Sequence, residues 1–358
     1  MPMVAIETRG RWGPARAVMP PTDAARSETY QLAVLQSVAC ESVGECIAVG
    51  SYTNTKHVDE PMTVSETHGV WGRALAVKLP ASAATGRGGL PVGLSSLACA
   101  SNGYCEAIVD YNSSTVDAAP TVATETAGVW GQASHITAPA GTSIAALGSL
   151  ACTARGECVA VGEANNRPML VAQTHGVWAP ARTVAPPPGV RFTSNEGAGH
   201  LFAVTCPTAG NCVAVGNYAA SNGSGAMAIS EVRSVWRHAQ RITLPANASN
   251  TRRRSLGLPP LLLSVACTRP GSCVAVGTYS NADVDLGADG LPVAAEETNG
   301  DWRRALQLNL PNDATASPPQ TSWLTSVACP DRAECVAAGF YLAADQQTQA
   351  MLLTRQKH

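Results

Sequence analysis

Charged residues are scarce in this chain of 358 residues, since Asp, Glu, Lys and Arg together make up 14% and the formal net charge is -2. A basic excess is what draws a protein to nucleic acid or to an anionic membrane surface, so we expect neither partner. Long apolar runs are missing too, because no stretch approaches the roughly 20 residues of a membrane span. Catalytic signatures are also absent: the sequence has no P-loop, no dinucleotide-binding fingerprint, and no motif that sets Ser, His and Asp in the chain order of a catalytic triad. No catalytic residue can therefore be assigned from motifs.

Cysteine, in contrast, is abundant, and its twelve residues form six pairs with the same C-x5-C spacing. Zinc sites usually space two cysteines by two to four residues and add a second pair or histidines, which is not the pattern here. Two cysteines that face each other across a tight hairpin fit disulfide geometry. The predicted disulfides are Cys40–Cys46, Cys99–Cys105, Cys152–Cys158, Cys206–Cys212, Cys267–Cys273 and Cys329–Cys335.

An even set of local disulfides is typical of proteins in an oxidising compartment. The first residues, MPMVAIETRGRWG, do not show the charged and then apolar pattern of a secretion signal. Two explanations stay open: the leader is absent from this sequence, or the protein is cytosolic with free thiols. We expect the first, and hence an extracellular or cell-surface protein.

The cysteine pairs mark an internal repeat, because their first members lie 59, 53, 54, 61 and 62 residues apart. Each repeat carries four short segments, as in residues 35–40, 46–50, 61–67 and 70–77. These segments are rich in Val, Ile, Leu and Thr and are bounded by Gly, Pro, Asn or Ser, so each predicts a β-strand, and none predicts a helix. Four antiparallel strands repeated six times predict an all-β fold, a six-bladed β-propeller with one disulfide hairpin in each four-stranded blade.

We expect a single propeller domain over residues 1–358, with repeats that start near residues 32, 91, 144, 198, 260 and 321. The chain ends in a third segment without its fourth, and it begins with a third and a fourth segment that lack the first two. Residues 1–20 are therefore expected to complete the last blade and to close the ring, which removes an exposed sheet edge. The count leaves one strand over, so one third segment must be displaced, or the sequence is part of something longer.

The second segment predicts how neighbouring blades pack. In the first repeat Cys46 and Ala48 fall on one face of the strand, and Ile47 and Val49 fall on the other. Small side chains let two sheets approach closely, while branched side chains fill the space between them. We therefore expect the inner strands to be buried on both faces, with local exceptions such as Glu106.

The turn between the third and fourth segments carries a second repeated motif, as in THGVW (67–71) and TAGVW (126–130). A glycine there supplies the positive φ that a short hairpin needs. The motif resembles a degenerate Asp-box, the S-x-D-x-G-x-x-W turn of sialidase-type propellers, although the aspartate is absent and the Gly-to-Trp interval is one residue shorter. The whole repeat, with its SVACxxxxxCVAVGSY core, resembles the cysteine-paired propeller repeats of secreted bacterial proteins.

Two kinds of connection are expected on opposite faces of such blades. The turns after the first and third segments are short and uniform, whereas the connections after the second and fourth segments are long and differ in every repeat. Variable loops on a rigid scaffold usually carry function, so we predict a binding site on the long-loop face. The aromatic candidates on this face are Tyr52, Tyr111, Tyr218, Tyr279, Trp323 and Tyr341.

Each candidate has a structural alternative. The tyrosines recur in register, as side chains that fill the space between blades would, and Trp323 is equally consistent with packing under its loop. Asp283, Asp285 and Asp289 have a spacing that supplies oxygen ligands to calcium, although their glycines are placed differently from those of the common calcium loop. We expect no other cofactor.

We expect a monomeric binding module for a glycan or a protein, without catalysis. The sialidase resemblance implies an alternative, a glycoside hydrolase or lyase that needs three arginines, a tyrosine paired with a glutamate, and an acidic aspartate. The arginines recur mainly after the fourth-segment tryptophans, where charge protects an edge strand: Arg16, Arg73, Arg182, Arg237 and Arg303. Acidic residues occur in the loops, including Glu60, Asp110, Glu163 and Glu196, but the sequence does not show which converge. A third reading is a structural ectodomain fragment.

Overall fold

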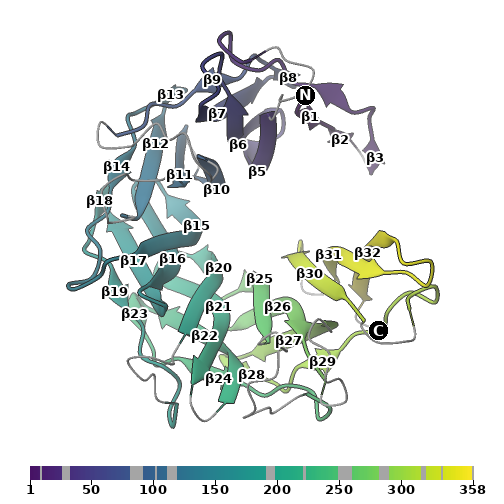
Figure 1. Ribbon diagram of the computed structural model, residues 1–358. Coiled ribbons are helices and arrows are strands. Elements are labelled where there is room, and N and C mark those ends of the chain that lie inside the picture. The colour runs from purple at the N-terminus through teal and green to yellow at the C-terminus, as the bar shows by residue number, and fades with distance from the viewer. Residues whose placement is uncertain are drawn as a thin grey trace. The chain divides into compact units, whose positions relative to one another are not determined.

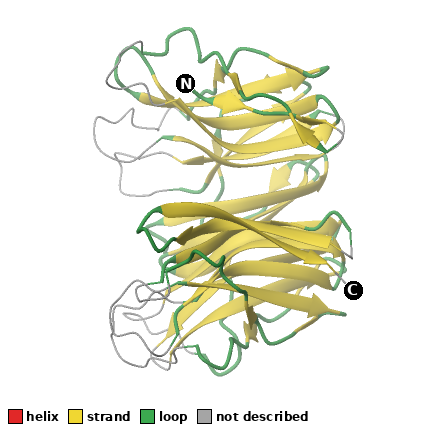
Figure 2. Cartoon of the chain, turned by 90° about the vertical axis from the view of Figure 1, so that its right-hand side faces the viewer, coloured by secondary structure: helices red, strands yellow, loops and turns green. Residues whose placement is uncertain are grey.

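The structure is a computed structural model of the chain, and it describes residues 1–8, 10–25, 33–80, 92–100, 103–110, 119–190, 198–220, 223–248, 260–281, 290–315, 320–331 and 334–356. Every regular element in these ranges is a β-strand, as Figure 2 shows. The described ranges accordingly contain no helix that could cross a membrane. The prediction of an all-β fold is confirmed.

Each repeat forms one antiparallel blade, numbered 1 to 6 along the chain (Figure 1). The first strands of blades 1 to 6 are β5 (Ala33–Ser42), β10 (Gly93–Ala100), β15 (Ala145–Ala154), β20 (Ala198–Thr208), β25 (Leu261–Arg269) and β30 (Ser322–Ala328). The second strands are β6 (Glu45–Thr53), β11 (Tyr104–Asp110), β16 (Glu157–Ala164), β21 (Asn211–Ala220), β26 (Ser272–Tyr279) and β31 (Glu334–Leu342). The third strands are β7 (Asp59–Thr67), β12 (Thr121–Thr126), β17 (Arg167–Thr174), β22 (Gly223–Val232), β27 (Leu291–Thr298) and β32 (Thr348–Gln356).

The fourth strand of blades 1 to 5 is interrupted, and both halves pair with the third strand. The first halves are β8 (Val70–Trp71), β13 (Val129–Trp130), β18 (Val177–Trp178), β23 (Val235–Trp236) and β28 (Asp301–Trp302). The second halves are β9 (Leu75–Ala76), β14 (Ser134–His135), β19 (Arg182–Thr183), β24 (Gln240–Ile242) and β29 (Leu306–Gln307). The predicted fourth segments are thus strands, but short ones.

The segments at the two ends of the chain also form strands. At the N-terminus β1 (Met3–Val4) pairs with β4 (Arg16–Ala17), and β2 (Glu7–Thr8) pairs with β3 (Arg11–Trp12). At the other end β30, β31 and β32 form a three-stranded sheet. Closure of a ring by these segments stays a prediction.

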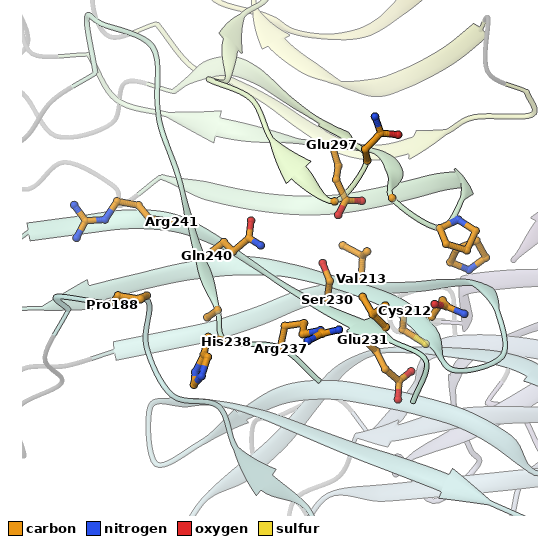
Figure 3. A pocket seen from close by; sticks show the side chains of 18 residues that line it. Pro188, Cys212, Val213, Ser230, Glu231, Arg237, His238, Gln240, Arg241 and Glu297 are labelled. Atoms are coloured by element: carbon orange, nitrogen blue, oxygen red, sulfur yellow. The ribbon is translucent and has the colours of Figure 1, made fainter. Parts of the chain in front are cut away.

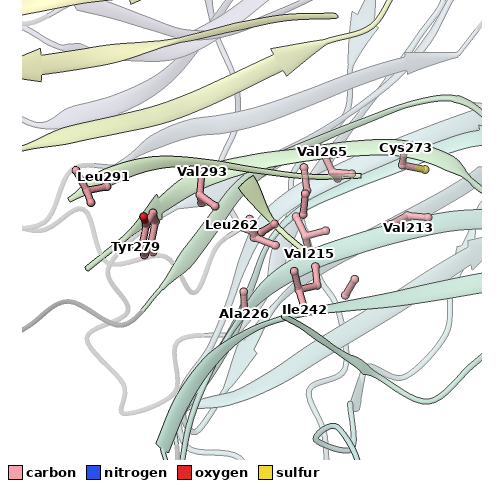
Figure 4. Packing of buried hydrophobic residues seen from close by; sticks show 14 residues of the cluster. Val213, Val215, Ala226, Ile242, Leu262, Val265, Cys273, Tyr279, Leu291 and Val293 are labelled. Carbon is pink, nitrogen blue, oxygen red and sulfur yellow. The ribbon is translucent and has the colours of Figure 1, made fainter. Parts of the chain in front are cut away.

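The chain divides into two compact units, Met1–Ala160 with Val171–Arg182, and Val161–Leu170 with Thr183–His358. Within each unit, neighbouring blades pack as the alternation of small and branched residues predicted. In the first unit Val49 of blade 1 packs in one cluster with Ala107 of blade 2. In the second unit Val215 of blade 4 packs in one cluster with Cys273 and Ala275 of blade 5 (Figure 4). Burial of one such valine is worth about 1.5 to 3 kcal/mol.

All six predicted disulfides are formed. In blade 2 the paired cysteines, Cys99 and Cys105, stand directly opposite each other in the register of β10 and β11. The same register holds in blades 1 and 5. Each disulfide therefore joins the first two strands of its blade next to their turn.

The short turns confirm the role expected for glycine. In blade 1 the turn after β7 has φ of 52° at His68 and 79° at Gly69, both in the left-handed region. Blade 4 lacks the glycine, and Arg233 and Ser234 adopt φ of 50° and 62° instead. The amide of Gly69 donates to the Gly44 carbonyl at 3.0 Å, so the two short turns of the blade lie side by side. This contact places the short turns on one face of the blade, as predicted.

The glycine of the second strand has a packing reason that the sequence did not reveal. The first strand of blade 1 is bulged between Leu35 and Ser37, and a Cβ atom at Gly50 would overlap the carbonyl oxygen of Val34. The equivalent glycines of blades 4, 5 and 6 meet the same obstacle: Gly216, Gly277 and Gly339.

Candidate functional site

The four described tyrosines among the predicted binding residues are buried. Their exposed fractions are 5% or less for Tyr52, Tyr218, Tyr279 and Tyr341. Rings with so little exposed surface offer no face to a ligand, so this geometry favours the structural alternative. Four other candidates lie outside the described residues: Tyr111, Asp283, Asp285 and Asp289.

Tyr52 shows what the buried tyrosines do. The single proton of its hydroxyl is shared between a carboxylate oxygen of Asp23, at 3.0 Å, and one of Glu60, at 2.8 Å. Asp23 lies in the connection that leads into blade 1, so the bond ties this connection to the end of β6. Burial, together with the two neighbouring carboxylates, raises the pKa of Tyr52 far above its ordinary value. The phenol therefore stays neutral and remains a hydrogen-bond donor.

The same contact bears on the hydrolase alternative. A tyrosine, a glutamate and an aspartate are the residue types that the sialidase resemblance implies for catalysis, and Tyr52, Glu60 and Asp23 meet here. The Tyr52 side chain is, however, fully buried, and its raised pKa opposes formation of the phenolate that a nucleophile requires. These three side chains therefore hold the connection to the blade and do not supply a nucleophile.

Blades 5 and 6 repeat the tie with other partners. The Tyr279 hydroxyl donates to Gln307 at 2.7 Å and lies 3.0 Å from Asn247 Oδ1. The Tyr341 hydroxyl donates to Asp313 at 2.8 Å. Asn247 and Asp313 occupy the place of Asp23 in the connections that lead into these blades. The long connections are thus fastened at their base.

Trp323 differs from the tyrosines because part of its surface stays exposed. It pairs in register with Phe340 across β30 and β31, with ring centroids 6.2 Å apart and an interplanar angle of 12°. The backbone of Gly290 lies beside it, and a Cβ atom there would be 3.2 Å from the indole nitrogen. The start of β30 is further held by the Ser322 hydroxyl, which donates to the Gly290 carbonyl at 2.6 Å. The indole is therefore held in place where the long connection enters blade 6.

A carboxylate and an imidazole meet at the same end of blades 3 and 4. The Glu163 Oε2 and His200 Nδ1 atoms are 3.5 Å apart, and the side chains are 31% and 24% exposed. His200 also stacks on Phe202, with ring centroids 4.3 Å apart. Glu163 was visible in the sequence as a loop acid, but its partner comes from the next blade and no local spacing pointed to it. Glu196 lies outside the described residues.

Glu106, the exception to the alternation in the second strands, is completely buried. Its Oε1 accepts hydrogen bonds from the Tyr104 hydroxyl at 2.6 Å, the Gln173 amide at 2.7 Å and the Thr124 hydroxyl at 3.0 Å. Burial raises the pKa of Glu106, while these three donors act in the opposite direction. A group without access to solvent does not serve a ligand, so this network is structural.

A further recurring pair was missed by the sequence analysis. In blades 1 to 5 the last part of the third strand places an acid or amide directly opposite the tryptophan of the fourth strand: Glu66, Glu125, Gln173, Glu231 and Glu297. All five opposing indole nitrogens are buried without a hydrogen-bond partner, as is one carboxylate oxygen in each of three blades. The signal was present as a Glu or Gln five residues before each of these tryptophans.

One cluster of metal-ligand types occurs among the described residues, formed by Glu41, Cys99 and Cys105, whose ligand atoms lie within 4.8 Å of one another. Both cysteines are in a disulfide and offer no thiolate. Glu41 accepts a hydrogen bond from the Gly103 amide at 3.0 Å. The cluster does not fit a metal, and the calcium prediction stays untested.

No protein-family model and no curated protein matches the sequence. Among solved structures, an ulvan lyase from a new family of polysaccharide lyases aligns with a TM-score of 0.52 and 9% identity, over 88% of this chain and 82% of its own. A protein of unknown function from Dyadobacter fermentans aligns with a TM-score of 0.46 and 11% identity, over 95% and 97% of the two chains. A Trypanosoma rangeli sialidase aligns with a TM-score of 0.45 and 11% identity, over 99% of this chain and 57% of its own. With the repeated disulfide-linked blades, the likeness to the lyase establishes the β-propeller fold and nothing finer.

Proposed function

We propose that the protein is an extracellular, non-catalytic module that binds carbohydrate on the face of the long connections. The observation that carries the proposal is the position of Trp323, which keeps exposed surface at the entrance to blade 6 and is held by Phe340. A flat, amphipathic ring that loses little conformational freedom is well suited to stack on the C–H face of a sugar.

The ties beneath the long connections support this proposal. Through Asn247 and Asp313, Tyr279 and Tyr341 hold the base of two connections against the second strands of their blades. Loops that are held at their base lose less entropy when a ligand orders them, which favours binding. A fold shared with a polysaccharide lyase is in keeping with a carbohydrate ligand.

A second candidate is a glycoside hydrolase or lyase on the same face. The pair of Glu163 and His200 favours it, because a partly exposed carboxylate beside an imidazole is a usual arrangement for proton transfer. The arginines that recur after the fourth-strand tryptophans, such as Arg73 and Arg182, are exposed, as expected of residues that protect an edge strand and not of a carboxylate clamp. We therefore rank the binding module first.

A glycan array run beside a panel of fluorogenic glycosides tests both candidates. We expect specific array binding without turnover. Trp323→Ala should weaken binding at least tenfold, and Trp323→Phe should retain part of it. Leu306→Ala, which removes a 60% exposed apolar side chain from the outer strand of blade 5, is the control and should change nothing.

Two outcomes would contradict the proposal. Unchanged array binding by Trp323→Ala would remove the site from this indole. Turnover of a glycoside with loss of activity in His200→Ala would establish the enzyme in place of the binding module.

A further inference from the structure

A cavity of about 860 Å³ opens between blades 4 and 5, within the second compact unit (Figure 3). Gly271 and Gly300 of the short turns contribute to one part of its wall, and Pro188 of the long connection before blade 4 contributes to another. Its volume is in the range of about 300 to 1,000 Å³ that is usual for small-molecule sites. The sequence analysis placed no site here.

Glu297 supplies a buried acceptor in this cavity. The side chain is 4% exposed and takes a hydrogen bond from Ser230, toward which its carboxylate points in Figure 3. Its Oε2 atom has no hydrogen-bond partner. A buried unpaired oxygen costs free energy that a donor group on a ligand would recover. The equivalent Glu66 and Glu125 also leave an oxygen unpaired, but it is Glu297 that lines the cavity.

Basic side chains line another part of the cavity. Arg241 comes from β24, and Arg237 and His238 lie between the two halves of the fourth strand of blade 4; all three are exposed. The matching segment of blade 1, WGRALA (71–76), carries one basic residue where WRHAQR (236–241) carries three. The Arg241 guanidinium lies over the Tyr218 ring, 5.7 Å from its centre, and points away from Arg237 and Glu297 (Figure 3), so Arg237 is the guanidinium available to a ligand.

The remaining wall includes three prolines, Pro188, Pro207 and Pro270. Proline presents a rigid apolar ring, and the described lining contains no Phe, Tyr or Trp side chain. A ligand that matches this lining has an apolar face, at least one hydroxyl to donate to Glu297, and a negative group to meet the Arg237 guanidinium.

We propose that this cavity binds an acidic saccharide, with a sugar carboxylate against Arg237 and a ring hydroxyl donating to Glu297. A guanidinium group binds a carboxylate through two parallel hydrogen bonds, which makes the contact selective as well as strong. An inorganic anion would leave the Oε2 atom of Glu297 without a partner, and a neutral sugar would leave Arg237 without an anionic partner. The site is separate from the one proposed at Trp323 and does not depend on it.

Isothermal titration with matched sugars tests the proposal. The probes are tetragalacturonate, its fully methyl-esterified form, tetramannuronate and a heparosan tetrasaccharide, each at low and at physiological salt. We expect at least one acidic oligosaccharide to bind, with affinity that falls as salt rises. We expect the methyl ester of tetragalacturonate to bind at least tenfold more weakly than the acid.

Variants locate the site. Arg237→Gln should reduce affinity for the acid to that for the ester. Glu297→Gln should weaken binding of both, and it is expected to fold because Gln173 occupies the same position in blade 3. Arg182→Gln, an exposed arginine of the fourth strand of blade 3, is the matched control and should bind normally. Trp323→Ala should bind normally too, which separates this site from the proposed function.

The proposal is overturned if none of the three acidic oligosaccharides binds, or if ester and acid bind equally. Unchanged affinity in Arg237→Gln would also overturn it. A tripeptide, Lys-Gly-Asp, serves as a competitor of different chemistry, because its ammonium group could pair with Glu297. Preference for this peptide over all three acidic sugars would show that the cavity binds a peptide, which would overturn the proposal.

Discussion

Replacing Glu106 with valine should destabilise the protein, although valine or isoleucine stands at this position in the other five blades. The reason is the set of donors that converge on the carboxylate. Gln173 and Tyr104, which are 3% and 4% exposed, donate to it at 2.7 Å and 2.6 Å. Without Glu106 the Gln173 amide loses its acceptor, and Tyr104 keeps only the Gln173 Oε1 at 3.1 Å.

The magnitude follows from the cost of orphaned donors. A buried donor without a partner costs about 1 to 3 kcal/mol, and relief of the buried carboxylate offsets part of the loss. We expect Glu106→Val to lower the free energy of unfolding by about 2 to 3 kcal/mol. Gln173→Glu should also destabilise, because two carboxyl groups would then lie in contact. One of the two carboxyl groups can remove this repulsion by binding a proton. For a group with an ordinary glutamate pKa, protonation at pH 7 costs at most about 4 kcal/mol, which sets the upper limit of the destabilisation.

The double variant Glu106→Val/Gln173→Glu distinguishes this account from a simple loss of packing. The double variant recreates the pairing found between blades 1 and 2. There blade 1 carries Ile47 at the position of Glu106, and it packs against blade 2, which carries Glu125 at the position of Gln173. We expect the pair to cost less than the sum of the single variants by at least about 2 kcal/mol, in a cycle of urea unfolding curves at pH 7. Additivity within about 0.5 kcal/mol would refute a direct interaction between the two side chains.

Three further predictions concern pH, the bulge glycine and the chain ends. Burial raises the pKa of Glu106 in the folded state, so the stability linked to this group is present below the ordinary glutamate pKa and is lost as the pH rises through the folded pKa. Glu106→Gln should flatten this part of a curve of unfolding free energy against pH. An unchanged slope would contradict the prediction. Gly216→Ala should destabilise the protein by about 3 kcal/mol and lower its melting temperature, because the new Cβ would overlap the His200 carbonyl. Gly13→Ala is the control and should change the melting temperature little, because the atom nearest to its new Cβ is 3.4 Å away. If the terminal segments complete a blade, Trp12→Ala should destabilise the protein by more than the roughly 0.5 kcal/mol expected for an exposed side chain, whereas a neutral effect would fit the 73% exposure of this indole.

A fourth prediction uses the disulfides. A loop of seven residues contributes about 2.4 kcal/mol in the chain-entropy model, so reduction of all six bridges should lower the urea midpoint substantially. Unfolding curves with and without a phosphine reductant provide the measurement, and mass spectrometry confirms complete reduction. An unchanged midpoint after full reduction would show that the bridges do not stabilise the fold.

The elements that the sequence predicted well are those with local causes. The alternation around Ala48, the turn at Gly69 and the spacing of Cys99 and Cys105 each involve residues close together in the chain. The strands, the turns and the disulfides follow from these short spacings, because backbone conformation and hairpin register are decided by neighbouring residues. The interruption of the fourth strands was not anticipated, since the sequence pattern there continues without a break.

The candidate sites were predicted less well, because they depend on residues from different blades. Tyr279 was a candidate for stacking on a ligand, and only the fold shows that Asn247 and Gln307 bury it and bind its hydroxyl. The partner of Glu163 is likewise supplied by the first strand of the next blade. Periodicity shows that a tyrosine recurs, but it does not show whether the ring meets solvent or protein.

The sequence by itself determined the repeated blade, because strand propensity, turn geometry and cysteine spacing all act within about sixty residues. Only the tertiary structure decided which polar groups are buried, which indole keeps exposed surface, and where a cavity brings Glu297 together with Arg237. The physical reason is that burial and charge pairing depend on distances between strands of neighbouring blades. Those distances are set by the packing of whole sheets.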